Sequence, residues 1–154
     1  MSAGDINSGL GCTIAIGTTA SNQLTDSYTN IGKVVTIPPV GLAYDNFGFA
    51  ALEDGFEQIF KSIGKGGSPS IGLGRKPSDA GQAAAIVARG SHLDYNFRIT
   101  LNDSSETTGS HGTEIYFKAK VLSYQTGPFA IGSVVMATMQ LGINAATFDE
   151  VAAT

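Results

Sequence analysis

Residues that could bind a metal ion or act as a nucleophile are few in this sequence and lie far apart. The two histidines, His92 and His111, are 19 positions apart, and neither has a second ligand at HxxxH or CxxC spacing. His92 shares a predicted strand face with Asp94, a pair that could hold an ion weakly or be a plain surface pair. No GxSxG nucleophile motif is present. The lone cysteine, Cys12, excludes an internal disulfide and is expected to be a small apolar side chain in a strand.

Glycine-rich loops and paired carboxylates could serve nucleotide binding or acid–base catalysis, but both are poorly placed. Gly64-Lys65-Gly66-Gly67 lacks the GxxxxGK[ST] frame, and neither it nor Gly72-Leu73-Gly74-Arg75 leads from a strand directly into a helix. The acid pairs Glu53-Asp54 and Asp149-Glu150 are adjacent in sequence, so their side chains diverge. We therefore expect no enzyme activity, no cofactor and no metal site.

A small share of charged residues and a large share of glycine distinguish the 154-residue chain. Charged residues make up 14%, against about 25% in ordinary globular domains, and 20 residues are glycine, nearly twice the usual share of about 7%. Because 42% of the chain is hydrophobic, residues 1–154 should fold as one domain rather than stay disordered. The neutral surface suits burial against identical neighbours, although a monomer coated with Ser, Thr, Asn and Gly would have the same composition.

Charge and hydropathy also restrict the partners. A net charge of −4 argues against binding nucleic acid through its phosphates, which needs a basic face. No apolar run approaches the roughly 20 residues of a membrane span, and the N-terminus lacks the basic and apolar regions of a secretory signal. We expect synthesis in the cytoplasm and no membrane association.

Most of the first half of the chain is typical of β structure interrupted by glycine. Residues 12–19 and 30–37 are rich in Thr and Ile, and Pro38-Pro39 ends the second run. Residues 40–55 form an irregular stretch that is longer than most loops, so it should have a task or a pairing of its own. Residues 56–63 and 70–75 are predicted to form a β-hairpin through the turn at residues 64–67.

One helix is predicted over residues 79–89, with Asp79 as its N-cap, Gln82 completing a capping-box-like pair and Gly90 ending it. Three strands follow, at residues 92–102, 112–123 and 133–143. Apolar and polar side chains alternate cleanly in the first two, and the third has a partly apolar second face. The predicted fold is mainly β: an antiparallel sandwich or barrel with one flanking helix.

The order of these elements carries a resemblance. The strand Glu57-Gln58-Ile59-Phe60-Lys61 precedes a strand ending in Arg75-Lys76-Pro77-Ser78 and the helix start Asp79-Ala80-Gly81-Gln82. The strand Tyr95-Asn96-Phe97-Arg98-Ile99-Thr100-Leu101, the run 112–121 and the closing segment 127–141 follow. This succession resembles the major tail tube proteins of long-tailed bacteriophages, in the superfamily that includes the type VI secretion tube. It covers residues 30–143, and residues 1–28 and 144–154 are possible extended terminal arms.

The resemblance implies a β-sandwich subunit with a flanking helix that joins into hexameric rings. The rings would stack into a tail tube around a tape-measure protein, contact tail terminator and distal tail proteins, and conduct DNA in transit. It also implies a location in the virion tail, after synthesis in the cytoplasm of a host bacterium. A ring barrel would use up edge strands that otherwise invite aggregation. The alternatives are a tube subunit of a related contractile or secretion apparatus, or a monomeric small-ligand-binding β-barrel.

The long stretch 40–55 is then a candidate inter-ring contact, with Tyr44, Asp45, Phe47 and Phe49 as its residues; alternatively, its aromatic rings cap the subunit's own core.

Charged residues are unevenly distributed along the chain. Six acids and one base occur through Phe60, whereas residues 61–76 hold four bases and no acid. This asymmetry predicts either a solvated basic run or a head-to-tail match between subunits, whose residues would be Lys61, Lys65, Arg75 and Lys76 with Glu53 and Asp54. Two polar sets are equally eligible to line the lumen: Asp94/Arg98 and Glu114/Lys118/Lys120.

Overall fold

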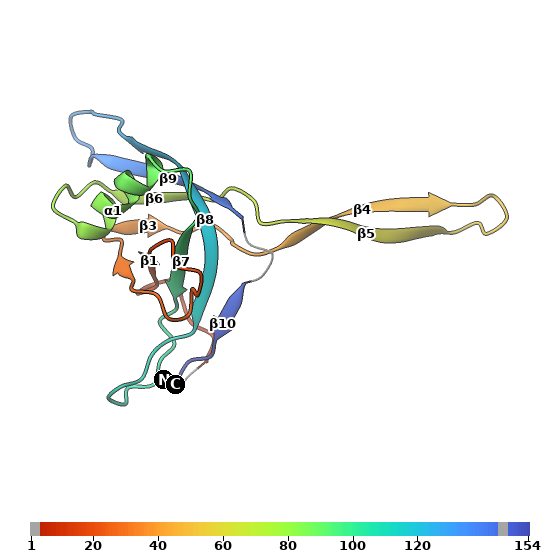
Figure 1. Cartoon of the computed structure of the whole chain (residues 1–154), viewed down its shortest axis with the longest axis horizontal. Helices are drawn as coiled ribbons and strands as arrows, with labels where there is room; N and C mark the ends of the chain where they lie inside the picture. The colour runs from red at the N-terminus through yellow and green to blue at the C-terminus, as the bar shows by residue number, and fades with distance from the viewer. Residues whose placement is uncertain (1–3, 145–147) are drawn as a thin grey trace.

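The computed structural model describes residues 4–144 and 148–154 of the chain. These residues form a curled antiparallel sheet with one helix against it, and a long two-stranded hairpin that projects from this body (Figure 1). The mainly β fold with one flanking helix is therefore confirmed. The elements are β1 (Thr13–Ile16), β2 (Thr29–Asn30), β3 (Val34–Thr36), β4 (Ala43–Ala50), β5 (Glu57–Lys65), β6 (Ser70–Gly74), α1 (Ala80–Arg89), β7 (Tyr95–Thr100), β8 (Glu114–Thr126), β9 (Met136–Ile143) and β10 (Asp149–Val151).

The body sheet has the strand order β2-β1-β7-β8-β9-β6-β3, and β10 pairs with β8. The alternation predicted for β7 and β8 is confirmed, because Phe97 pairs with Phe117 and their rings stack 5.7 Å apart in the core. Ile99 and Ala119 are buried on the same face. Leu93 precedes β7 and is exposed, so the predicted apolar face begins at the strand itself.

The last long strand is shorter than predicted. β9 begins at Met136, and Ala137, Met139 and Leu141 are buried, as their alternation predicts. Val134 lies before the strand and is exposed. The apolar character that suggested a second strand face therefore belongs in part to the loop between β8 and β9.

The boundaries of α1 agree with its predicted caps. The Asp79 carboxylate accepts a hydrogen bond from the Gln82 backbone N–H at 2.9 Å, and Gly90 is the C-cap. The second half of the predicted capping box is absent. The Asp79 backbone N–H donates to the Lys76 carbonyl, and the Gln82 side chain turns into the body instead.

Small residues allow α1 to lie close against the sheet. A Cβ atom at Gly81 would lie 2.1 Å from the Asn30 carbonyl oxygen of β2, so only glycine fits there. Ala85 and Ala88 are fully buried on the same side of the helix. The predicted close packing of a small-residue helix is confirmed.

The predicted hairpin of residues 56–63 with 70–75 is wrong. β5 pairs with β4, which precedes it, from Ala43 opposite Lys65 to Ala50 opposite Glu57. β6 pairs instead with β9 and β3 inside the body. β5 ends at Gly64-Lys65, so the glycine-rich segment connects the hairpin to the body and is not the turn of a hairpin between β5 and β6. The expectation that residues 40–55 have a pairing of their own is confirmed by β4.

Segments near both ends of the chain contribute to the body. β1 lies between β2 and β7, and β10 pairs with β8; residues 1–3 and 145–147 of the possible terminal arms fall outside the described residues. The Gly4 backbone N–H donates to the Asp103 carbonyl, and the Ser105 N–H donates to the Thr154 carbonyl. The two ends of the described chain therefore meet at one loop (Figure 1).

Candidate assembly surfaces

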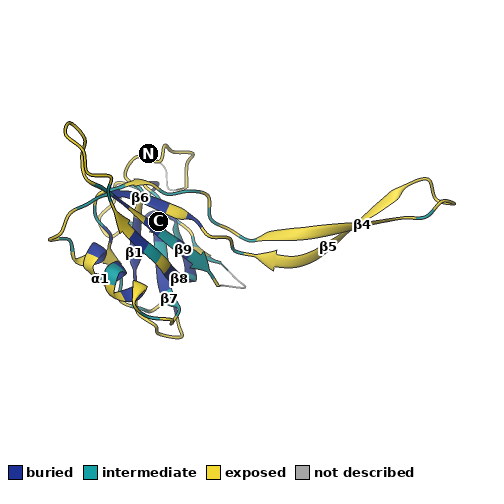
Figure 2. Ribbon diagram, turned by 90° about the horizontal axis from the view of Figure 1, so that it is seen from above, coloured by how far each residue is buried: buried dark blue, intermediate teal, exposed yellow. Residues whose placement is uncertain are grey.

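Both strands of the projecting hairpin, residues 43–65, are exposed along their whole length (Figure 2). Its two strands pair only with each other among the described residues. A two-stranded hairpin without a covered face is at best marginally stable in water. Eight of its large apolar side chains are nevertheless open to solvent: Tyr44, Phe47, Phe49, Leu52, Phe56, Ile59, Phe60 and Ile63.

Both faces of the hairpin carry apolar side chains. Phe47 lies opposite Phe60, and their rings stack with centroids 5.3 Å apart. Ile59, the neighbour of Phe60 in β5, lies opposite Gly48 and points to the other face, because successive side chains of a strand alternate. Contiguous exposed apolar surface of this kind marks a site of association. The alternative that Tyr44, Phe47 and Phe49 cap the subunit's own core is wrong, because all three are exposed.

Two of the predicted basic contact residues have partners within the same hairpin. The Lys65 ammonium lies 2.7 Å from the Asp45 carboxylate, and the Lys61 ammonium lies 3.7 Å from the centroid of the Tyr44 ring. Both side chains of the Lys65–Asp45 pair are more than half exposed, so this pair contributes little to stability. The structure therefore brings residues of the predicted inter-ring contact, Tyr44 and Asp45, next to residues of the predicted electrostatic contact, Lys61 and Lys65.

The tip of the hairpin is acidic and apolar. Glu53 and Asp54 lie in the turn between β4 and β5, and Glu57 begins β5. The turn also exposes Leu52 at 107% and Phe56 at 70% of their full accessibility. None of these three acids forms an ion pair with another described residue. Sequence reasoning named Glu53 and Asp54 but missed the two apolar side chains beside them.

The other two predicted bases, Arg75 and Lys76, lie at the opposite end of the body. They follow β6, which leads away from the hairpin towards the turn before α1 (Figure 1). They border a shallow groove whose lining is Lys33, Val34, Val35, Gly74, Arg75, Lys76, Val134 and Met136. Sequence reasoning did not connect Lys33 or Val134 with these bases, because the groove forms only when β3, β6 and β9 come together.

Gln82 holds the basic end in place. Its side chain is fully buried, and its Oε1 accepts hydrogen bonds from the Arg75 guanidinium at 3.1 Å and from the Lys76 backbone N–H at 3.0 Å. Its Nε2 donates to the carbonyl oxygens of Gly32 and Gly74. One helix side chain thus fixes the segments on both sides of the groove.

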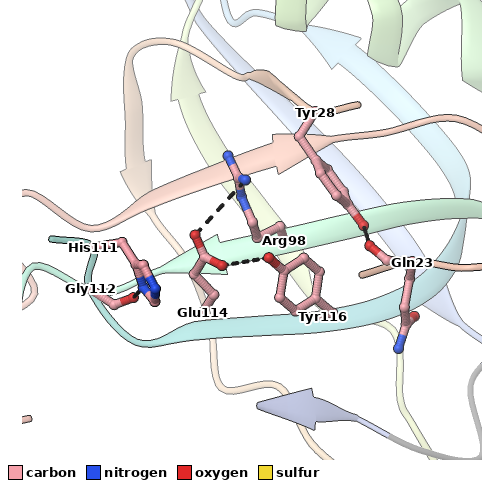
Figure 3. Close-up of polar contacts among 7 residues, drawn as sticks. All are labelled: Gln23, Tyr28, Arg98, His111, Gly112, Glu114 and Tyr116. Atoms are coloured by element: carbon pink, nitrogen blue, oxygen red, sulfur yellow. Dashed lines mark hydrogen bonds and ion pairs between the residues drawn. The ribbon is translucent and has the colours of Figure 1, made fainter. Parts of the chain in front are cut away.

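The polar face of β7 and β8 is covered by the chain itself (Figure 3). Arg98 lies 3.9 Å from the Glu114 carboxylate and 4.9 Å from the centroid of the Tyr28 ring. The Tyr116 hydroxyl donates to Glu114, and the Tyr28 hydroxyl donates to the Gln23 carbonyl. Burial, together with nearby negative charge, raises the pKa of Tyr28 far above its ordinary value. These contacts join β7 and β8 to the segment between β1 and β2, although the buried Arg98 Nε has no hydrogen-bond partner among the described residues.

The two polar sets predicted as possible lumen residues, Asp94/Arg98 and Glu114/Lys118/Lys120, lie on the same face of the sheet. Arg98 of β7 lies opposite Tyr116 of β8, which is on the same face as the second set. Lys120 forms an ion pair with Asp94 at 2.5 Å, and the Lys118 ammonium donates to the Ser21 carbonyl at 3.0 Å. The segment between β1 and β2 therefore crosses this face, a covering that strand alternation alone does not predict.

The described residues contain no group of three His, Cys, Asp or Glu side chains that could hold a metal ion. Asp94 is engaged by Lys120 and Asn144 rather than by His92. The His111 Nδ1 lies 2.9 Å from the Gly112 carbonyl oxygen (Figure 3). Cys12 is half-buried and lies just before β1, so the expectation that it is part of a strand is wrong. Within residues 4–144 and 148–154, no helix has the length and apolarity needed to cross a membrane.

No protein-family model matches the sequence, and no curated protein matches it. Several solved structures match over nearly the whole chain, among them the following three. The baseplate of the anti-feeding prophage, reconstructed with six-fold symmetry, aligns with 98% of this chain and 97% of its own at 15% identity, with a TM-score of 0.69. The sheath/tube terminator of the extracellular contractile injection system PVC aligns with 97% and 99% at 12% identity, with a TM-score of 0.68. The SPP1 tail tube aligns with 96% and 79% at 14% identity, with a TM-score of 0.65.

At these identities the likeness is one of fold. It extends over the body, the helix and both ends of the chain, since each alignment covers at least 96% of this sequence. The resemblance drawn from the order of the predicted elements is confirmed at this level. The chain has the fold of tail tube and contractile-injection-system tube proteins.

Proposed function

We propose that this protein is a structural subunit that polymerises into a tail tube, a stack of hexameric rings. The observation that carries the proposal is the projecting hairpin, which exposes large apolar side chains on both faces. A hairpin of this kind is covered when it lies between neighbouring subunits. The likeness in fold to a tail tube and to a baseplate component of six-fold symmetry supports the same reading.

The energetics of association favour this role for the hairpin. Complete burial of an aromatic or aliphatic side chain stabilises by about 1.5–3 kcal/mol. Fixing one subunit on another costs about 4–15 kcal/mol in lost translational and rotational freedom. The eight exposed side chains of the hairpin are enough to offset a cost of that size when neighbours cover them. We assign Tyr44, Asp45, Phe47 and Phe49 to the inter-ring contact.

The proposed role has consequences for partners and location. A tube subunit acts in the virion tail after synthesis in the host bacterial cytoplasm, and it has no catalytic task or cofactor. Its partners would be further copies of itself, a tape-measure protein, a tail terminator and distal tail proteins, with DNA only in transit. The net charge of −4 suits a conduit that DNA passes through without binding.

The experiment that tests the proposal compares assembly of the wild-type protein and a hairpin variant by sedimentation velocity and negative-stain microscopy. The wild type should form rings and rods as its concentration rises, and Phe47→Ser/Phe49→Ser should remain dispersed with an unchanged melting temperature. Leu93→Ser is the matched control, since it removes a similarly exposed side chain from the body. A wild type that stays monomeric at every concentration would refute the proposal.

A tube of a contractile injection system is the second candidate. It is favoured by the high fold similarity to the anti-feeding prophage and PVC structures. Isolating native assemblies and identifying their other proteins decides between the two: a contractile apparatus contains a sheath protein around the tube.

A further inference from the structure

Resting on the proposed function, we propose that the hairpin tip of one subunit docks into the basic groove at the opposite end of another copy. The tip is formed by Leu52, Glu53, Asp54, Phe56 and Glu57. The groove is lined by Lys33, Arg75 and Lys76 around an apolar floor of Val34, Val35, Val134 and Met136. The occupant of the groove is therefore a second copy of this chain.

The two surfaces match in chemistry. Each combines three charges of one sign with exposed apolar side chains, and the signs are opposite. Leu52 and Phe56 on the tip would lie on Val35 and Val134, which are 68% and 74% exposed. Opposite charges around an apolar centre guide the diffusional encounter of two partners and fix the register in which they bind.

Most of these charges are available; the exception is Arg75, which is half-buried and donates to the Gln82 Oε1. Lys33 and Lys76 are exposed, and neither forms an ion pair with a described residue. Asp79, which precedes α1, is held by the backbone N–H groups of Gly32 and Gln82, and its charge also interacts with Lys76. On the hairpin, Lys65 is already paired with Asp45, so the tip keeps its negative sign.

The opposed placement of the two surfaces determines the kind of assembly. Figure 1 shows the hairpin at one end of the molecule and the turn between β6 and α1, whose residues border the groove, at the other, so tip-to-groove contact is head-to-tail. Such a contact leaves a free tip and a free groove on every pair, so it can add further copies and continues as an open stack when the rotation between copies does not close into a ring. That is the property that a stack of rings requires and a closed dimer lacks.

The test uses charge reversal at each surface in the full chain. Glu53→Lys/Asp54→Lys makes the tip basic, and Lys33→Glu/Lys76→Glu makes the groove acidic. Each variant alone should raise the concentration needed for rod formation by roughly tenfold or more, because attraction becomes repulsion. An equimolar mixture of the two should restore rods near the wild-type concentration, since each basic tip now meets an acidic groove.

The control is Glu106→Lys/Glu150→Lys, which makes the same change in net charge as the reversed tip, at exposed acids on the body, and should leave assembly unchanged. If a reversal variant unfolds, as judged by circular dichroism, the neutral pairs Glu53→Gln/Asp54→Gln and Lys33→Gln/Lys76→Gln replace it, and each should still weaken assembly. Rods that form normally with a reversed tip, or a mixture that fails to recover, would overturn the docking proposal while wild-type rods keep the tube proposal intact. A wild type without rods would overturn both.

Discussion

Replacing Gln82 with alanine should strongly destabilise the subunit, although the residue lies on a helix where alanine is favoured. The Gln82 side chain is fully buried and makes five hydrogen bonds, with Gly32, Gly74, Arg75, Lys76 and Tyr124. The substitution leaves the Tyr124 hydroxyl of a buried residue without its acceptor, and it leaves the carbonyl of the half-buried Gly74 without the Gln82 donor. A buried unsatisfied polar group costs about 1–3 kcal/mol.

We therefore expect Gln82→Ala to lower the free energy of unfolding by about 3 kcal/mol, allowing for water that enters the site. For a chain of this length, each kcal/mol lowers the melting temperature by about 2–4 °C, so the total shift should be about 6–12 °C. Urea unfolding of the dispersed subunit, followed by circular dichroism, measures the change.

Tyr124→Phe is the matched control because it removes one member of the network, the hydroxyl that donates to Gln82 at 3.0 Å. It should cost about 1 kcal/mol. The double variant should then be less destabilised than the sum of the two single changes, since both remove the same hydrogen bond. A loss below about 1 kcal/mol for Gln82→Ala, or strict additivity with Tyr124→Phe, would refute the idea that this side chain holds the basic end together.

Two further variants probe the body. Gly81→Ala should lower the free energy of unfolding despite the gain of about 1 kcal/mol in helix propensity, because the added Cβ would lie 2.1 Å from the Asn30 carbonyl oxygen. Urea unfolding should show this loss. A more stable variant would contradict the packing of α1 on β2. Hydrogen bonds from the Thr113 hydroxyl and backbone N–H hold the pKa of Asp103 below its ordinary value. A carboxyl with a lowered folded-state pKa contributes stability above its unfolded pKa of about 4 and loses it as the pH falls through the folded value. Asp103→Asn should therefore be less stable than wild type at pH 7 yet depend less on pH below about 4; parallel pH profiles of the urea midpoint would count against this role.

The parts of the fold that the sequence predicts well are those where burial produces a pattern. In β7 and β8 one face packs in the core, so apolar and polar residues alternate, and this alternation predicts the buried face of both strands correctly. The ends of α1 were likewise predicted, because Asp79 and Gly90 are local signals. The capping-box contact predicted for the Gln82 side chain is wrong, because the partners of that side chain lie up to 50 positions away.

The hairpin was harder to predict because neither of its faces is buried in the subunit. Without a buried face, no alternation is imposed on β4 or β5, and Phe47 and Ile59 occupy opposite faces in an apparently irregular stretch. The glycines at residues 64–67 then favoured a turn in the wrong place. The contact residues named from the sequence do lie on the hairpin or the groove, but Lys33 and Val134 join the groove only through the pairing of β6 with β3 and β9.

The hairpin also differs from the body in when it can form during synthesis. Its two strands are joined by residues 51–56 alone. In the body, by contrast, β1 pairs with β7 and β10 pairs with β8, and each of these pairs is separated by a much longer stretch of chain. Because closing a short loop costs less conformational entropy than closing a long one, the hairpin can form while the central strands are still being made. A nascent chain then exposes the apolar side chains of the hairpin before the body has folded. Slow, dilute expression should accordingly give a larger yield of well-formed rods than rapid overproduction.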